Sequence, residues 1–154
     1  MKPGVFSQLY IQLVFAVKNR EAVLHPEIRN HVFEYISGII AKTGHKSIIV
    51  NGVSDHIHVF IGLNPAITIS DTVHDIKRGA SLFINQEKLC PAHFNWQDGY
   101  GAFSYSRTHI ENVFRYIQNQ ENHHRKQTFR EEYLEFLKKF QIEYDKRYLF
   151  DFFE

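Results

Sequence analysis

The order of strand-like and helix-like segments constrains the fold of this chain more than any other feature. Short runs rich in β-branched and aromatic residues predict four strands, over 5–17, 45–53, 56–63 and 100–106. Apolar residues at helical spacing predict a helix from Pro26 to near Gly44 and another over 69–85, where Ser70 or Asp71 can form the N-cap. The order strand, helix, strand, strand, helix, strand is typical of the ferredoxin-like fold. We therefore expect an α+β, ferredoxin-like (RRM-like) antiparallel sheet with helices packed on one face.

Two further helices are predicted after this pattern, over 109–124 and 129–141, followed by aromatic residues that continue to Phe153. A chain of 154 residues has the usual size of one domain. We expect 1–154 to form a single domain, in which 129–154 is an added C-terminal helix and aromatic tail. The tail either covers a helix or extends a dimer interface.

Charge and composition exclude several classes of protein. The net charge is only +1, so a nucleic-acid partner would be bound by a local patch and not by a basic shell. The chain has one cysteine, no apolar run of about 18 residues and no signal-peptide pattern at its start. We expect a cytoplasmic protein without a membrane partner. Ten histidines justify a search for a metal site.

The segment Asp55-His56-Ile57-His58 is the sharpest local feature of the sequence. Side chains alternate along a strand, so both histidines would project on one side, roughly 6.5 to 7 Å apart at the backbone, while Ile57 and Val59 face the core. Two imidazoles can bind one divalent cation and leave coordination positions open, as a catalytic metal requires. The alternative is an exposed pair of histidines with no metal.

Tyr116 and Gln120 form a second candidate pair, one helical turn apart on the same face of the predicted third helix. A phenol can act as a covalent nucleophile when a nearby metal or base activates it, and an amide oxygen can complete a metal site. The alternative is that Tyr116 is a packing residue whose hydroxyl lies at the rim of the core.

Together, these motifs resemble those of the single-tyrosine HUH transposases of the insertion-sequence 200/605 group, where HUH stands for His, hydrophobic residue, His. The resemblance rests on DHIH at 55–58, WQDGYGAFS at 96–104 and YIQNQ at 116–120, in this order. It extends to KNR at 18–20, KR at 77–78, ENHHRK at 121–126, Phe129 and Glu132, and so covers nearly the whole chain.

The resemblance implies a homodimeric transposase that cleaves and rejoins single-stranded DNA next to imperfect hairpins. It implies that His56 and His58 bind Mg²⁺ or Mn²⁺, that Gln120 is the third ligand, and that Tyr116 attacks the scissile phosphate. The products would be a 5′-phosphotyrosine and a free 3′-hydroxyl. In this family the tyrosine helix of one subunit can complete the histidine site of the other, so the site could be shared between subunits.

DNA contacts must come from local groups. Basic side chains near the expected site are candidates for phosphate contacts, namely Lys77, Arg78, Arg107, Arg115, Arg125 and Lys126. Tyr100, Phe103 and Tyr105 are candidates for stacking on unpaired bases; the alternative for all of these is a solvated surface or the core. His123 and His124 point about 100° apart on a helix, so we expect them to contact DNA or an interface and not to share an ion.

Three other functions are open, and the sequence alone does not separate the first of them, a domesticated relative, from a mobile transposase. A domesticated relative, similar to the REP-associated tyrosine transposases, would act on chromosomal hairpins without moving its own element. A catalytically silent module would bind single strands on its sheet, as RNA-recognition folds do. A metallohydrolase for small phosphate esters would use His56 and His58 but not Tyr116.

Overall fold

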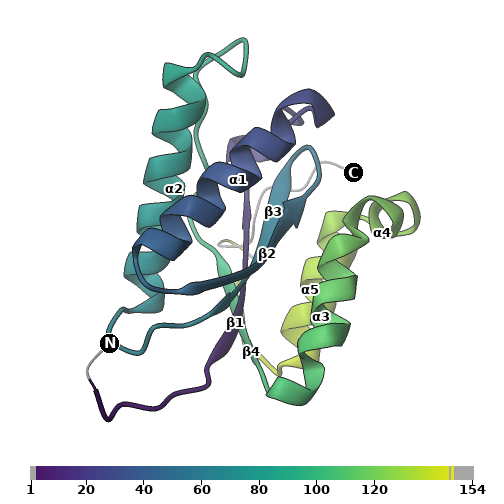
Figure 1. The fold of residues 1–154 in the computed structure, drawn as a ribbon. Helices are drawn as coiled ribbons and strands as arrows, with labels where there is room; N and C mark the ends of the chain where they lie inside the picture. The colour runs from purple at the N-terminus through teal and green to yellow at the C-terminus, as the bar shows by residue number, and fades with distance from the viewer. Residues whose placement is uncertain (1–2, 146, 148–154) are drawn as a thin grey trace.

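The computed structural model describes residues 3–145 and 147. Within these residues an antiparallel sheet has the strand order β2-β3-β1-β4 (Figure 1). The strands are β1 (Tyr10–Ala16), β2 (Lys46–Gly52), β3 (His56–Gly62) and β4 (Gly101–Tyr105). With the helices α1 (Pro26–Lys42) and α2 (Ile69–Gln86) between them, they confirm the predicted ferredoxin-like order.

The first strand is shorter than predicted, because both of its neighbours end at the same level. Tyr10 pairs with Gly62 of β3 and with Tyr105 of β4, and neither strand continues beyond these residues. The segment before Tyr10 therefore has no strand to pair with, and Phe6 is 93% exposed.

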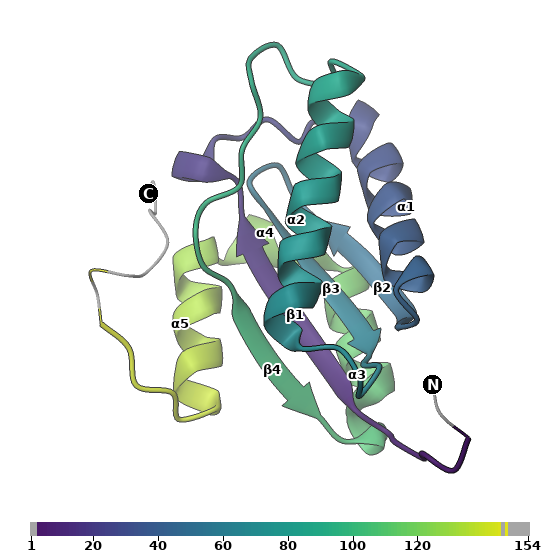
Figure 2. The same cartoon turned by 90° about the vertical axis from the view of Figure 1, so that its left-hand side faces the viewer.

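One face of the sheet packs against α1 and α2 (Figure 2). Alternate residues of β1 and β3 point into this core, among them the fully buried Leu13, Phe15 and Val59. The N-cap of α2 is Thr68, whose hydroxyl accepts a hydrogen bond from the Asp71 amide, and not the predicted Ser70 or Asp71.

The opposite face is covered as well, by α3 (Ile110–Gln118), α4 (Gln120–Lys126) and α5 (Phe129–Lys139), which lie together across the sheet from α1 and α2 (Figure 1). The expected C-terminal helix is α5, whose residues Phe129, Tyr133 and Leu137 pack on Phe103 of β4. Because α3 and α4 lie on this second face too, the sheet is buried on both sides. Polar side chains that β1 and β3 direct to this face are consequently buried.

The predicted helix over 109–124 is divided into separate segments. A 3-10 turn, η2 (Arg107–His109), precedes α3, and Asn119 separates α3 from α4 with φ −96° and ψ 24°. Tyr116 therefore lies on α3, whereas Gln120 begins α4. Of the helices in the described part of the chain, none combines the length and the apolar character needed to cross a membrane. The predicted aromatic tail lies largely outside the described residues, which end with 145 and 147.

Candidate metal and nucleophile centre

Strand β3 directs His56 and His58 to the face that α4 and α5 cover, while Ile57 and Val59 face the other core, as predicted. Both histidine side chains are fully buried, and their ring centroids are 5.4 Å apart. The alternative of an exposed pair is therefore wrong. Phe129 of α5 stacks on the His56 ring, with a centroid distance of 3.8 Å and an interplanar angle of 9°.

A carboxylate from α5 lies between the histidines. Glu132 Oε1 is 3.1 Å from His58 Nε2 and 3.5 Å from His56 Nε2, and only 1% of the side chain is exposed. No role is predicted for Glu132 from the sequence motifs. The signal was present, because Glu132 falls among Phe129, Tyr133 and Leu137 on the buried face of an amphipathic helix, where a charged side chain needs a partner.

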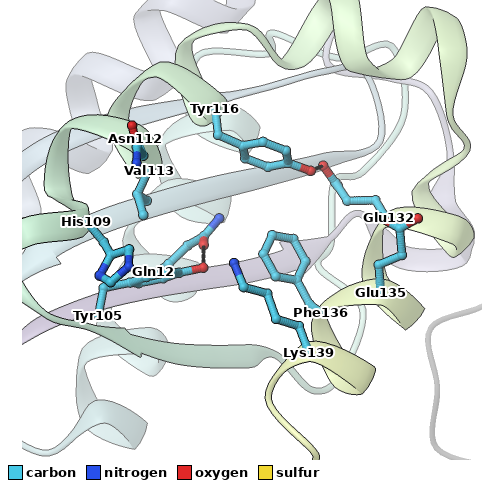
Figure 3. A pocket seen from close by; sticks show the side chains of 10 residues that line it. All are labelled: Gln12, Tyr105, His109, Asn112, Val113, Tyr116, Glu132, Glu135, Phe136 and Lys139. Atoms are coloured by element: carbon cyan, nitrogen blue, oxygen red, sulfur yellow. Dashed lines mark hydrogen bonds between the residues drawn. The ribbon is translucent and has the colours of Figure 1, made fainter.

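The same carboxylate contacts the candidate nucleophile. The Tyr116 hydroxyl donates a hydrogen bond to Glu132 Oε2, and Gln120 Nε2 donates to the same oxygen at 3.2 Å. Figure 3 shows the phenol of Tyr116 and the carboxylate of Glu132 directed at one another. The structure thus brings Tyr116 and Gln120 to the histidine pair within one chain.

The two adjacent histidines of α4 diverge, as their helical positions require. The His123 ring stacks on Tyr116 with centroids 4.4 Å apart. His124 Nε2 lies 3.1 Å from His56 Nε2 and 3.2 Å from Glu132 Oε1. His124 therefore belongs to the centre, which its position in the sequence did not indicate.

Two sets of hydrogen bonds hold the outer nitrogens of His56 and His58, which are the Nδ1 atoms; the Nε2 atoms face Glu132. His56 Nδ1 is 2.7 Å from Asp55 Oδ1, and Arg20 donates to Asp55 Oδ2 from Nε at 3.0 Å and from Nη2 at 2.8 Å. His58 Nδ1 is 2.8 Å from Gln12 Nε2, and the Tyr105 hydroxyl donates to Gln12 Oε1 at 2.9 Å. Arg20 has a positive φ of 51°, a strained conformation for a residue with a side chain.

Burial and charge shift the ionisation of these groups in different directions. Burial opposes ionisation of Asp55, but the adjacent His56 and Arg20 outweigh it and lower its pKa to about 2. Burial likewise disfavours the carboxylate of Glu132, yet the imidazoles around it, led by His58, hold its pKa well below the usual range. Burial lowers the pKa of His58. For Tyr116, burial and the Glu132 carboxylate raise the pKa, so its phenol is protonated at neutral pH.

The donor set fits a divalent metal ion. Ligand atoms of His56, His58 and Glu132 all lie within 4.8 Å of one another. Gln120 Oε1 is buried beside them, and no hydrogen-bond donor of residues 3–145 or 147 reaches it. Imidazole and carboxylate ligands together suit a metal such as Mn²⁺, whereas Mg²⁺ favours oxygen ligands.

A cavity of about 340 Å³ leads to the candidate nucleophile, Tyr116 (Figure 3). It lies between α3 and α5, over β1 and β4, and Tyr116, Glu132, Gln12 and Tyr105 are in its walls. Tyr116 is thus reached from this side. The volume is within the range of small-ligand sites, about 300 to 1,000 Å³.

Four of the six predicted phosphate contacts lie on the helical segments of the site face. Arg107, Arg115, Arg125 and Lys126 are exposed on η2, α3 and α4. Arg115 forms an ion pair with Glu111 on the same helix. Exposed basic side chains are therefore present on and around the helix that carries Tyr116.

The remaining predicted DNA contacts are placed differently. Lys77 and Arg78 belong to α2, on the opposite face of the sheet, and Lys77 Nζ donates to the carbonyls of Gln97 and Gly99. Tyr100 is 38% exposed just before β4, whereas Phe103 is 2% exposed and packs under α5, so it cannot stack on a base.

The fold and the centre define an α+β domain that buries a His-hydrophobic-His pair against a helical tyrosine. Residues 5–120 match the family of IS200-like transposases, and the chain belongs to this family. It is 28% identical over 124 residues to the ISDra2 transposase TnpA of Deinococcus radiodurans, covering 76% of this chain and 87% of that protein. Glu132 and His124 lie beyond residues 5–120, which the family match covers.

Two solved structures share the fold. One is described as a transposase from Deinococcus radiodurans R1, with a TM-score of 0.62, 22% identity, and coverage of 78% of this chain and 96% of that chain. The other is a REP-associated tyrosine transposase bound to a REP hairpin, with a TM-score of 0.55, 12% identity, and coverage of 82% and 74%.

Proposed function

We propose that this transposase cleaves and rejoins single-stranded DNA through a covalent bond between Tyr116 and a 5′-phosphate. The observation that supports this most directly is the shared contact of Glu132, which joins the Tyr116 hydroxyl to the His56 and His58 pair. A nucleophile and a metal-binding cluster thus meet at one buried carboxylate.

His56 and His58 would hold a divalent ion, Mg²⁺ or Mn²⁺, with Gln120 Oε1 and Glu132 as the further ligands. The ion supplies positive charge that neutralises the phosphate oxygens in the transition state. Support for Gln120 is its unpartnered buried oxygen, and support for Glu132 is its distance to both imidazoles. Phosphoryl transfer depends mainly on such charge neutralisation and on in-line positioning.

Tyr116 Oη would attack the scissile phosphorus, and the bond from phosphorus to the 3′-oxygen would break. The phenol proton passes to the solvent, and water protonates the departing 3′-oxygen. The products are a 5′-phosphotyrosine and a 3′-hydroxyl, and attack by a 3′-hydroxyl reverses the step without a nucleotide cofactor.

The proposed substrate is a single strand that carries imperfect hairpins. The structural neighbour bound to a REP hairpin supports this class of substrate, as do the exposed basic side chains of Arg107, Arg115, Arg125 and Lys126. Tyr100 is exposed and can stack on an unpaired base. Contacts by Lys77 and Arg78 would require DNA to reach the opposite face of the sheet.

We also propose a homodimer, in keeping with the family resemblance. The contacts of Tyr116 with Glu132 and of Glu132 with His58 occur within one chain, so a complete centre does not need a second subunit. Exchange of α3 between subunits would be required for a shared site. Sedimentation of the protein with and without hairpin DNA measures the oligomeric state.

The test is cleavage of a hairpin-flanked single strand, taken from beside the coding sequence, followed on a denaturing gel with and without Mn²⁺. We expect a covalent protein–DNA band that needs the ion and disappears in Tyr116→Phe, while DNA affinity stays within about twofold. His56→Ala and His58→Ala should abolish the ion-dependent band. Tyr35→Phe, which changes a partly exposed tyrosine of α1 on the opposite face of the sheet, is the matched control and should form the adduct normally.

The outcomes separate the competing functions. An adduct through a different tyrosine would disprove the assignment of Tyr116. Tight binding of the strand without any adduct would favour the silent binding module. Cleavage of a small phosphate ester that survives Tyr116→Phe would favour the metallohydrolase, and the genomic position of the cleaved hairpins distinguishes a mobile transposase from a domesticated one.

A further inference from the structure

The outer nitrogens of the two paired histidines have chemically different partners. His56 Nδ1 contacts the carboxylate of Asp55 at 2.7 Å, whereas His58 Nδ1 contacts the amide of Gln12 at 2.8 Å. A carboxylate only accepts hydrogen bonds, but an amide offers both an acceptor and a donor. The two histidines are therefore not prepared for a metal ion in the same way.

For His56 the hydrogen-bond network assigns one tautomer. Asp55 is ionised and accepts at Oδ1, so the ring proton of His56 is on Nδ1. The lone pair is then on Nε2, which lies 3.1 Å from His124 Nε2, and the His124 N–H can donate both to this nitrogen and to Glu132 Oε1. Carboxylate–histidine pairs of this kind orient metal ligands and make them more basic. His56 is thus ready to bind an ion.

For His58 the network assigns the other tautomer. The Tyr105 hydroxyl donates to Gln12 Oε1, so the amide nitrogen of Gln12 faces His58 and donates to Nδ1. On the other side of the ring, Nε2 is 3.1 Å from a carboxylate oxygen of Glu132, which can only accept. The proton is therefore on Nε2, the nitrogen that a metal ion at the centre would need.

We propose that Gln12 is a positioning residue that sets the tautomer of His58 and thereby the metal affinity of the centre. Ion binding at His58 Nε2 requires the Gln12 amide to turn over. Gln12 Oε1 then accepts from His58 Nδ1–H, and Gln12 Nε2–H donates to the Tyr105 oxygen. Water takes the proton from His58 Nε2 and supplies one to His58 Nδ1, so the ring stays neutral. This inference rests on the proposed metal role of His56 and His58.

The turnover also connects the centre to the cavity. Gln12 and Tyr105 both line the cavity that leads to Tyr116, and the Tyr105 hydroxyl is held only by the Gln12 oxygen among the hydrogen bonds of the described side chains. When the amide turns, the Tyr105 hydroxyl loses its acceptor on Gln12 and can donate its hydrogen bond to a group in the cavity. A ligand there that accepts this hydrogen bond, such as a nucleotide oxygen, would favour the metal-binding tautomer.

Two substitutions at Gln12 should change Mn²⁺ affinity in opposite directions. Gln12→Glu places a carboxylate opposite Nδ1 and fixes the proton there, so we expect binding on the order of tenfold tighter. Gln12→Met keeps the size but removes the hydrogen bond, and should weaken binding by about 10- to 100-fold. Gln118→Glu adds the same charge on the exposed side of α3 and is the matched control, with an expected change below twofold. Calorimetric titration of the full chain with Mn²⁺ measures all four proteins.

The tautomer itself is read from the imidazole ¹⁵N chemical shifts of the full-length protein. We expect the His58 proton on Nε2 in the metal-free wild type and on Nδ1 after addition of Zn²⁺, a diamagnetic probe. In Gln12→Glu both ring nitrogens of His58 face a carboxylate, and Nδ1 should carry a proton before any metal is added. A merely structural role of Gln12 would not move this proton.

The results distinguish this inference from the proposed function. If the wild type bound no Mn²⁺, the proposed metal role and the inference would both fail. If the wild type bound Mn²⁺ but both Gln12 variants bound it equally well, or His58 carried its proton on Nδ1 without metal, only the role of Gln12 would be overturned.

Discussion

Single residues of this protein take roles that their type alone does not suggest. Glu132 lies on the apolar side of α5, where the chain would ordinarily place a hydrophobic residue. Its burial is compensated by hydrogen bonds from Tyr116, Gln120 and His124, because an unpaired buried carboxylate would be strongly destabilising. A charged residue among buried neighbours therefore marks the centre of this site.

Lys77 is a charged residue that was predicted to contact DNA but forms hydrogen bonds within the fold. Its ammonium group donates to two carbonyls of the loop before β4, at 2.8 Å from Gln97 and 2.7 Å from Gly99. We expect Lys77→Met to lower the free energy of unfolding by about 1 to 3 kcal/mol, since both carbonyls lose a charged donor. Urea denaturation measures this change.

Arg78 is the control for this substitution, because it is the adjacent residue of α2 and is exposed. Arg78→Met should change the free energy of unfolding by less than about 0.5 kcal/mol. Equal stability of both variants would show that the Lys77 contacts do not hold the loop.

At the scale of elements, the β2–β3 hairpin fixes the position of His56. A Cβ added at Gly52 would meet the backbone oxygen of His56 and lie 2.8 Å from Ile57 Cα. Because these are backbone atoms of a central strand, we expect Gly52→Ala to destabilise the protein by about 1 to 3 kcal/mol and to weaken Mn²⁺ binding.

The same substitution in α1 should have the opposite effect. Gly38 lies in the interior of that helix, and a Cβ there would have no atom within 4 Å. Gly38→Ala should raise the free energy of unfolding by about 0.5 to 1 kcal/mol, because alanine is the better helix former. Thermal unfolding of both variants compares the two elements, and a stabilising Gly52→Ala would contradict the hairpin argument.

For the whole molecule, the sheet lies between two helical layers, and the charged groups buried at its centre pair with one another. Asp55 titrates near 3.8 in an unfolded chain but has a folded pKa of about 2. The folded state therefore favours the ionised form, and this contribution is complete above about pH 4 and is lost as the pH falls toward 2. Its size is on the order of 2 kcal/mol.

We expect the free energy of unfolding to decrease from pH 5 to pH 2, and Asp55→Asn to show a shallower decrease. Urea denaturation across this range measures both slopes. An identical acid dependence in the variant would show that Asp55 does not contribute to it.

The sequence by itself determined the order of the elements, the face of β3 on which His56 and His58 lie, and the family. These features follow from local periodicity and from short motifs, which the chain carries in consecutive residues. Helical spacing also predicts Tyr116 and Gln120 on one face, and their side chains do meet at Glu132. Their catalytic and metal-binding roles remain predictions.

The tertiary structure decided which distant residues complete the centre. Gln12 comes from β1, His124 from α4 and Glu132 from α5, and each reaches the histidine pair only because the second helical layer folds over the sheet. The break at Asn119 and the end of β1 at Tyr10 also depend on neighbours far away in sequence. Periodicity reports which side of its own element a residue occupies, but the group that it meets there depends on how the elements pack.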